Sequence, residues 1–494
     1  MPVRGSHPAA VSEHQTPLHT ARRAGNYLIL SAAEAAGKLF NFAAFTHLGR
    51  TLGPEQYGLL EFVIAVMAFF TLAADMGLSV CGAREVAKNP SFVPSLASEI
   101  VFARGALTFL TAVALFAGLP WLPVPEAARG LLYLYGVSLF GSPLLIQWYF
   151  QGREAMAWVA AASVIRNGVF AGLVLAAIRT ASPLWHVGWI ECAAVVCTAG
   201  FCLAAARQRF GLKVSSMHVT LRSAWRRLRE AVPLGLAELT WAAMWYLSTT
   251  LLGLWRTDAS LGWFGASHRV VMALHTFVWL YFYNLLPAVS RFAGSSSEQL
   301  RHTITSSLRL TAWLSVFAAW TLGLLAPVLL PIAFGPSFAS GGSLLQALVW
   351  MIPITMLSGH YRYTLIACGL QKRLLAGTAT GAITTAALGV WLIPRWGATG
   401  AVWCLLAGGL ADFACAYSFV RRGVTPIPFL KSLLGPAAAA AAAALSLSLG
   451  RVWFGASGAA IGGIFTYLTC AFICERSFLT RVIYRIFGQG EHHA

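Results

Sequence analysis

Charged side chains are scarce in this sequence. Only 11% of the 494 residues are Asp, Glu, Lys or Arg, whereas 58% are hydrophobic. Soluble globular domains carry about 25% charged and about 45–50% apolar residues. So few charges cannot solvate a soluble surface of this size, so the composition excludes a water-soluble enzyme, a disordered chain and a disulfide scaffold. The composition is that of an all-α polytopic membrane protein, whose outer surface faces lipid instead of water.

Motifs for metal binding, redox chemistry and nucleotide hydrolysis are missing as well. The nine cysteines include no CxxC pair and no Cys/His cluster at zinc-ligand spacing. Cys192, Cys197 and Cys202 are five residues apart, a step that places successive side chains on different faces of a helix. No G-x-x-x-x-G-K-[ST] segment occurs. We therefore expect no metal, no cofactor and no ATP motor.

Long apolar runs dominate the sequence. A helix needs about 20 mostly apolar residues to cross about 30 Å of hydrocarbon, and about 14 stretches meet this length. They lie at 25–48, 59–80, 99–119, 131–150, 155–178, 184–206, 231–255, 261–289, 305–332, 343–367, 374–393, 397–420, 432–450 and 452–474. The thirteenth, built on an alanine run at 437–444, is the least hydrophobic.

The basic residues are placed as in a membrane protein. Lys and Arg outnumber Asp and Glu by 35 to 17, and most of them lie in short breaks between the apolar runs. Alternate breaks carry 23 and six basic residues, and cytoplasmic loops collect Lys and Arg. The sequence therefore predicts a multi-pass protein of the cytoplasmic (inner) membrane with both termini in the cytoplasm and no nucleic-acid partner.

We expect two six-helix bundles and two further helices. Short segments recur six predicted spans apart, as in Gln151-Gly152-Arg153 and Cys368-Gly369-Leu370-Gln371-Lys372, which predicts parallel repeats about an axis along the membrane normal. The second half of the linker, with Leu221, Trp225 and Leu228, predicts an amphipathic helix on the membrane surface. The predicted parts are a cytoplasmic segment 1–24, a bundle 25–206, a basic cytoplasmic linker 207–230, a bundle 231–420, two additional spans 421–474 and a tail 475–494.

Six basic residues lie inside predicted spans. Arg104 and Arg309 lie near the cytoplasmic ends, where long side chains reach the headgroups. A charge at the bilayer centre costs about 2.5–3.5 kcal/mol even on the lenient insertion scale, so the deeper residues should face the bundle interior or a water-filled cavity. These are Lys38, Arg166, Arg269 and Arg362.

Two kinds of partner could satisfy these four cations. If each pairs with an intramembrane acid, as Glu34 is placed to do for Lys38, the site is neutral and structural. The other partner is an anionic substrate, since Arg forks match phosphate oxygens. Nearby polar and aromatic residues suit a sugar: Asn41, Asn167, Trp241, Trp245, Tyr246, His268, His275, His360, Tyr361 and Tyr363. Glu238, Trp241 and Trp245 share one helical face, which helix packing or an interfacial aromatic belt would explain equally well.

Several short segments resemble a known family. Residues 49–90 contain Leu52-Gly53-Pro54, Tyr57-Gly58, Asp75-Met76-Gly77-Leu78 and Ala83-Arg84-Glu85. Later segments are Leu286-Pro287 with Ser290-Arg291, Phe334-Gly335 with Phe338, and Gly397-Ala398-Thr399-Gly400-Ala401. Together, over residues 25–420, they resemble the polysaccharide transporter family, which are bacterial flippases of lipid-linked oligosaccharides in the multidrug/oligosaccharidyl-lipid/polysaccharide exporter superfamily.

This resemblance implies both architecture and activity. It implies two bundles in a V arrangement that opens alternately to either side and carries a polyprenyl-pyrophosphate-linked oligosaccharide to the outer leaflet for cell-surface polysaccharide biosynthesis. The implied partners are this substrate, membrane lipids and polysaccharide polymerase or assembly proteins. It also implies coupling to H⁺ or Na⁺, for which the candidates are Glu34, Glu238, Asp75, Glu191 and Asp412.

Two other functions are weighed against a flippase. A drug or cation antiporter of the same superfamily would favour an acidic cavity, whereas bases and acids are mixed in these spans. A membrane-embedded glycan polymerase or ligase would be expected to carry a substantial external loop, and the predicted external loops are about a dozen residues or shorter. The sequence therefore favours a transporter over an enzyme.

Overall fold

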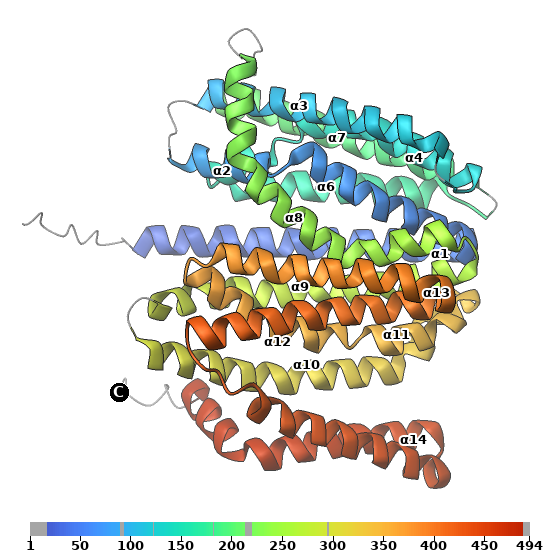
Figure 1. The fold of residues 1–494 in the computed structure, drawn as a ribbon, viewed down its shortest axis with the longest axis vertical. Helices are drawn as coiled ribbons and strands as arrows, with labels where there is room; N and C mark the ends of the chain where they lie inside the picture. Colours follow the sequence, from blue (N-terminus) through green and yellow to red (C-terminus); the bar gives the residue numbers. More distant parts are fainter. Residues whose placement is uncertain are drawn as a thin grey trace, which may run out of the picture.

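The structure, a computed structural model, describes residues 17–88, 93–121, 123–180, 182–212, 220–293 and 296–487 and contains no strand in these ranges. The all-α fold class is confirmed (Figure 1). The helices are α1 (Pro17–Asp75), α2 (Leu78–Lys88), α3 (Val93–Gly118), α4 (Glu126–Ser138), α5 (Gln147–Gly152), α6 (Met156–Ala177), α7 (Trp185–Phe210), α8 (Leu221–Trp255), α9 (Ala259–Ala293), α10 (Ser297–Phe334), α11 (Gly342–Leu348), α12 (Met351–Ala367), α13 (Gln371–Gly423) and α14 (Phe429–Phe487), with short 3₁₀ segments η2 (Leu119–Trp121), η3 (Leu139–Leu144) and η5 (Pro336–Gly341).

Eleven helical segments of the described chain are long and apolar enough to cross a membrane. Two of them, in α1 and α13, contain a break at Gly53 (φ 74°) and Gly397 (φ 56°), and each covers two of the predicted spans. Glycine adopts this left-handed backbone without the clash that a Cβ would cause, so the LGP and GATGA motifs mark turns. The predicted span 231–255 lies in α8, which is not among the eleven segments, so the count of 14 is not confirmed.

Some boundaries differ from the prediction. The predicted span 131–150 is divided into α4, η3 and α5, with Pro143 inside η3. The predicted surface helix is the first part of α8, which begins at Leu221 after Thr220 accepts a hydrogen bond from the Ser223 backbone N–H. The rest of the predicted division into domains stays a prediction. Parts of the terminal segments and of the linker lie outside the described residues, namely 1–16, 213–219 and 488–494.

The helices form two lobes with an additional hairpin. We call α1–α7 the N-lobe and α8–α13 the C-lobe. The same packing recurs in both: α1 lies along α6, and α8 lies along α13. The two arms of α14 pack on α10 through Trp313, Tyr467 and a group of alanines. Helix α1 begins and α14 ends on the same side of the molecule, which we call the termini end; the opposite side is the far end (Figure 1).

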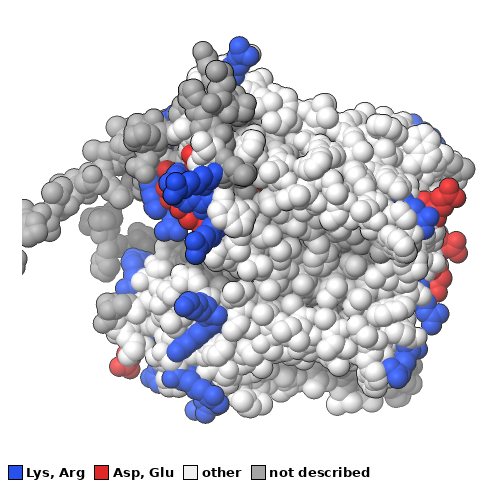
Figure 2. Space-filling view, turned by 45° about the horizontal axis from the view of Figure 1, so that its top comes forward, with Lys and Arg blue, Asp and Glu red and all other residues white. Residues whose placement is uncertain are grey.

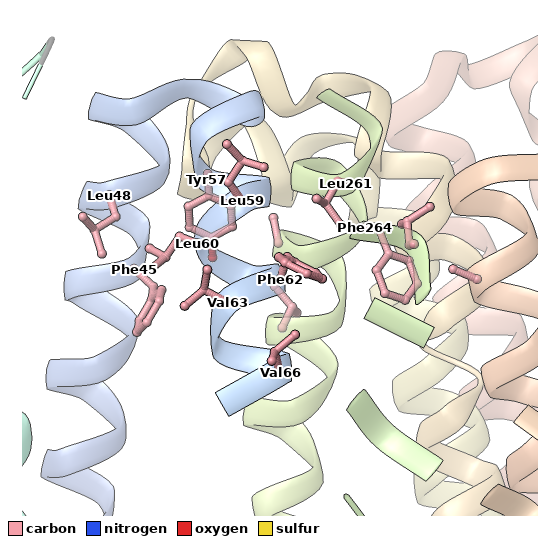
Figure 3. Close-up of a cluster of buried hydrophobic side chains, with 14 of the residues drawn as sticks. Phe45, Leu48, Tyr57, Leu59, Leu60, Phe62, Val63, Val66, Leu261 and Phe264 are labelled. Atoms are coloured by element: carbon pink, nitrogen blue, oxygen red, sulfur yellow. The ribbon is translucent and has the colours of Figure 1, made fainter. Parts of the chain in front are cut away.

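The two lobes meet at the far end. A Cβ placed on Gly58 would lie 2.6 Å from the Gly262 backbone nitrogen, so this contact requires glycine. Beside it, the Tyr57 ring lies 5.6 Å from the rings of Phe334 and Phe338. Figure 3 shows the two arms of α1 side by side, with the second arm, which carries Phe62, lying between the first arm and the part of α9 that carries Leu261 and Phe264.

Burial along α1 decreases toward the termini end, where Leu39 is 69% exposed, while Leu48 is fully buried. On that side the beginning of α8 contacts the N-lobe, because Gly235 packs against Met76 and Arg227 pairs with Glu99 at 2.9 Å. The lobes are therefore closed at the far end, and α8 crosses from one lobe to the other.

Charged residues on the surface lie in two bands. Figure 2 shows Lys and Arg gathered at one end of the visible face, a few charges of both signs at the opposite end, and an uncharged surface between them. Large apolar side chains such as Phe109, Val196 and Leu314 are more than half exposed in the part between the ends. An apolar band of this kind is what lipid requires, so the chain is a multi-pass membrane protein.

The far-end contact can be tested at Gly262. A Cβ in Gly262→Ala would overlap the Pro54 carbonyl, a backbone atom that cannot rotate away. We expect a loss of about 1–3 kcal/mol of stability, as in other overpacked contacts, measured as a lower midpoint of thermal unfolding in detergent. Gly105→Ala is the control because its Cβ meets nothing within 4 Å. Equal midpoints for the two variants would show that the lobes do not meet as described.

Candidate functional site

An ion pair joins the two lobes. Arg269 of α9 in the C-lobe makes two parallel bonds to Glu61 of α1 in the N-lobe, from Nε to Oε1 at 2.6 Å and from Nη2 to Oε2 at 2.9 Å. The carboxylate approaches α9 closely because Gly265 has no side chain at that point. The guanidinium also lies over the Phe45 ring, 3.3 Å from its centroid. This bidentate geometry is the strongest that Arg and a carboxylate form.

Hydrogen bonds extend this ion pair into the N-lobe. Arg269 Nη1 donates to Asn41 Oδ1 at 3.4 Å, and Asn41 Nδ2 donates to Asn167 Oδ1 at 3.3 Å. The neighbour of Asn167 on α6, Arg166, forms an ion pair with Glu191 of α7. The structure thus brings together Asn41, Arg166, Asn167 and Arg269, which the sequence predicted as one group.

Arg362 forms a second centre in the C-lobe. Its Nη1 lies 3.5 Å from Asp412 Oδ2 of α13, which also accepts a hydrogen bond from Ser358 at 3.2 Å. On the same helix, His360 donates from Nδ1 to the Met356 carbonyl and accepts at Nε2 from Ser307 at 2.8 Å. These bonds stay inside the C-lobe.

Each intramembrane arginine that the sequence singled out has a carboxylate partner. For these arginines the conformation seen here matches the neutral alternative that the sequence left open, an alternative that also included a pair for Lys38. The pairs are Arg104–Asp75, Arg166–Glu191, Arg269–Glu61, Arg309–Glu475 and Arg362–Asp412. The pairs join different helices, or the C-lobe to α14, so each also fixes how two helices pack.

Two sequence expectations need correction or completion. Arg104 was expected to reach the headgroups, but it is buried and lies 2.9 Å from Asp75, which also accepts from the Ser79 hydroxyl at 2.5 Å. Lys38 is exposed on the less buried part of α1. The predicted Lys38–Glu34 pair is untested because the Glu34 side chain lies outside the described residues.

Aromatic and imidazole rings line the start of the C-lobe. The Trp245 ring lies 4.7 Å from His275 and 6.1 Å from His268, and Trp241 lies 6.5 Å from His275. Two buried polar atoms of this group, Trp245 Nε1 and His268 Nε2, have no hydrogen-bond partner among the described residues. Glu238 is half-buried one helical turn before Trp241.

The three tyrosines predicted to contact the sugar, Tyr246, Tyr361 and Tyr363, lie in different places. Tyr246 is close to His268, with ring centroids 6.0 Å apart. Tyr361 is fully buried against Phe413 and Tyr417 in the C-lobe, and Tyr363 stacks on Phe282 at 5.0 Å. The structure therefore places Tyr246 with the rings of Trp241 and Trp245, and the other two in the C-lobe interior.

Glu61 is the residue that the sequence analysis did not select for the site. A signal was present, because Glu61 stands in the apolar run Gly58-Leu59-Leu60-Glu61-Phe62-Val63, and a carboxylate in a span carries the same cost as a cation. Its partner could not be read from the sequence, because Arg269 is 208 positions away. No group of three or more His, Cys, Asp or Glu side chains that could hold a metal is found among the described residues.

Comparison with known proteins places the chain in a family. The model of the family described as "Polysaccharide biosynthesis protein" matches residues 24–293. A protein of Shigella dysenteriae named "Putative O-antigen transporter" is 23% identical over 390 residues, which are 77% of this chain and 96% of that protein. A protein of the same name from Escherichia coli (strain K12) is 24% identical over 172 residues, 34% of this chain and 41% of its own length.

Solved structures show the same fold. A structure of the lipid II flippase MurJ in an inward closed conformation superposes with a TM-score of 0.74, covering 92% of this chain and 100% of that chain at 11% identity. An inward-facing multidrug resistance MATE family transporter of the MOP superfamily gives 0.62, covering 81% and 95% at 15% identity. The V-shaped arrangement of two bundles implied by the sequence is thus a MurJ/MATE-like fold.

Removing one partner of the central pair should destabilise the protein. Glu61→Gln leaves the Arg269 guanidinium without its counterion, and breaking a buried pair costs about 3–5 kcal/mol. We expect a clear fall in the midpoint of thermal unfolding in detergent. Glu85→Gln is the control because it breaks the exposed pair with Lys88, worth about 0–1 kcal/mol. The double variant Glu61→Gln/Arg269→Gln should recover part of the loss; no recovery would contradict a direct interaction.

Proposed function

This chain belongs to the Polysaccharide biosynthesis protein family, and from that premise we propose that it is a flippase of a polyprenyl-pyrophosphate-linked oligosaccharide. It moves the glycan from the cytoplasmic to the outer leaflet of the inner membrane by alternating access, for assembly of a cell-surface polysaccharide. The names of its O-antigen relatives and the fold shared with a lipid II flippase support this substrate class.

The substrate sets the physical problem. A pyrophosphate-sugar head cannot enter hydrocarbon, because its charge and hydroxyl groups would lose hydration without replacement. Two lobes closed at the far end leave the head to enter from the termini end, which the basic loops place in the cytoplasm. The polyprenyl tail stays in lipid. Lys38, exposed on α1 toward this end, is the first cation that the head meets.

The observation that carries the proposal is the Arg269–Glu61 pair between the lobes. Arg269 is buried among protein groups yet keeps 19% of its side chain exposed, and Arg166 and Arg362 keep 26% and 22%. A pyrophosphate presents pairs of oxygens that a guanidinium can bind bidentately, as it binds the carboxylate. The head therefore binds by replacing Glu61, Glu191 or Asp412 as the partner of these arginines.

This exchange supplies a reason for ion coupling. A carboxylate that loses its arginine to phosphate is left as an uncompensated charge in a low-dielectric site. Uptake of H⁺ or Na⁺ neutralises it, so passenger and ion occupy the site together. Glu61, Glu191 and Asp412 lose a partner in this way, and Glu238 and Glu34 stay candidates on the helices nearest the entrance. Asp75 is the weakest candidate, because its partner Arg104 is buried within the N-lobe.

The sugar part of the head has partners beside the arginines. Trp241 offers a partly exposed flat face. Separation of α8 from α9 would make the buried Trp245 Nε1 and His268 Nε2, which have no hydrogen-bond partner among the described residues, available to hydroxyl groups. Asn41 and Asn167 lie between the two arginines of the central network. His360 belongs to the second centre, next to Arg362.

Transport should depend on the arginines of the central network, Arg269 and Arg166. In proteoliposomes that hold a fluorescent lipid-linked oligosaccharide, we expect Arg269→Ala or Arg166→Ala to reduce the translocation rate about tenfold or more, the value of a charge-assisted hydrogen bond. Arg309→Ala is the matched control, because it breaks an intramembrane pair away from the lobe interface. Normal flipping by both the Arg269→Ala and the Arg166→Ala variants would rule out the cation site, and glycan product without translocation would favour an enzyme.

The shape of the cation at position 166 can be tested separately. If a bidentate fork binds the phosphate, Arg166→Lys should slow translocation nearly as much as Arg166→Ala, because Lys supplies a point charge only. The readout is the initial rate in the same vesicles at equal protein density. A rate equal to that of the unaltered protein would show that charge alone suffices at this position.

A further inference from the structure

A groove lies at the far end, outside the central network. It is an open depression of about 380 Å³ where α1 and α6 of the N-lobe meet α10 of the C-lobe. One face of α1 forms its long wall, with Phe42, Thr46, His47 and Arg50 one above another over two turns, and Leu175 of α6 and Ala333 of α10 complete it. The groove is apolar near Phe42 and positively charged near Arg50, where α1 approaches its turn at Gly53.

Arg50 connects the two lobes at the mouth of this groove. Its Nε donates to the Ala333 carbonyl at 2.9 Å, and its Nη2 donates to the Ile332 carbonyl. These carbonyls belong to the last turn of α10, which ends at Phe334. A guanidinium has five N–H donors, so this contact holds the fork in place and leaves three donors for another acceptor.

The charge at the mouth favours an anion. A helix C-terminus carries about half a negative unit charge, and the full positive charge of Arg50 exceeds it. No ion pair to Arg50 is found in the described part of the chain. His47 is held by its own bond to the Ile178 carbonyl at 3.0 Å, so its ring forms a fixed part of the wall.

Apolar side chains are exposed on α6 and α10, the two helices that complete the groove. Leu175 is 46% exposed, and Ile332 and Val328 on α10 are 65% and 56% exposed. These side chains face lipid in a membrane protein. A molecule that fills the groove therefore has an anionic group at Arg50 and a hydrocarbon part along the exposed leucine, isoleucine and valine.

We propose that this groove binds the phosphate group of a membrane lipid in the leaflet at the far end. Phosphate is the anion that lipids present at this depth, and Arg is the side chain best suited to it. The same chemistry is found in a resident phospholipid and in a polyprenyl phosphate. The walls belong to both lobes, so the bound lipid stabilises the conformation in which the far end is closed.

The proposal goes beyond the transport activity. Which leaflet the far end faces follows from the orientation used in the proposed function, but binding in detergent does not depend on it. A protein that fails to flip glycans would still bind phosphate lipids here, so the two proposals fail separately.

The test measures thermal unfolding of the full chain in a phosphate-free maltoside detergent. The probes are dioctanoyl phosphatidylglycerol, farnesyl phosphate and, as the phosphate-free control, farnesol. We expect at least one phosphate lipid, and not farnesol, to raise the midpoint with a saturating dose dependence. Arg50→Gln should weaken the apparent affinity about tenfold, whereas Arg256→Gln, an exposed arginine of the neighbouring far-end loop, should leave it unchanged.

Arg50→Lys distinguishes a loss of lipid binding in Arg50→Gln from a folding defect. It keeps the positive charge and should retain part of the lipid response. A response to phosphatidylglycerol alone identifies a resident phospholipid, and a response to farnesyl phosphate alone identifies a polyprenyl phosphate; both support the site. The proposal is overturned if Arg50→Gln responds like the unaltered protein, if farnesol acts as well as the phosphates, or if neither phosphate lipid has an effect.

Discussion

The constraint on which this structure depends is the high free energy of an unpaired charge in hydrocarbon. A guanidinium inside the bundle has little water to solvate it, and each intramembrane arginine described above is held by a carboxylate from another helix or another arm of one. Arg104 holds α3 to α1, Arg166 holds α6 to α7, and Arg362 holds α12 to α13. Because an uncompensated partner is costly, such pairs restrict how neighbouring helices can slide or rotate. The apolar side chains supply most of the contact area, and the ion pairs select the register.

The pair between Arg269 and Glu61 differs from the others in its position. The other four join helices of one lobe, or the C-lobe to α14, and can persist through a rigid-body movement of the lobes. Arg269–Glu61 spans the lobe interface, close to the far-end contact at Gly58 and Gly262. Separation of the lobes at the far end must therefore break this pair or carry one partner with the other. In the proposed transport cycle, the lobes can separate once the substrate pyrophosphate pairs with Arg269 and an ion neutralises Glu61.

The sequence predicted much of the fold and only part of the site. Apolar length defines the spans, and the glycine motifs around Gly53 and Gly397 coincide with turns, because both features act over a few neighbouring residues. The cost of a buried charge, applied to single residues, identified Arg166, Arg269 and Arg362. It could not identify their partners, since the choice of Glu61 for Arg269 depends on how two distant helices pack. Arg104 shows the same limit: its position near a span end suggested contact with headgroups, but Asp75 and the surrounding N-lobe enclose it.

Internal ion pairs also bear on how a carrier returns empty. If the arginines of the empty site were unpaired, the protein would have to change conformation with uncompensated charges inside the membrane. The passenger would remove this barrier only for the step in which it is carried, and not for the return of the empty protein. With Glu61, Glu191 and Asp412 in place, the empty site is neutral. Arg166 and Arg362 keep their partners while the lobes move, so only the Arg269–Glu61 pair has to be exchanged. The passenger then competes with carboxylates already present, so its binding is weaker than bare arginines would give, and release on the other side is easier. A site that binds a pyrophosphate and also lets it go needs such competitors, which is why the paired arginines are compatible with transport and not only with structural support.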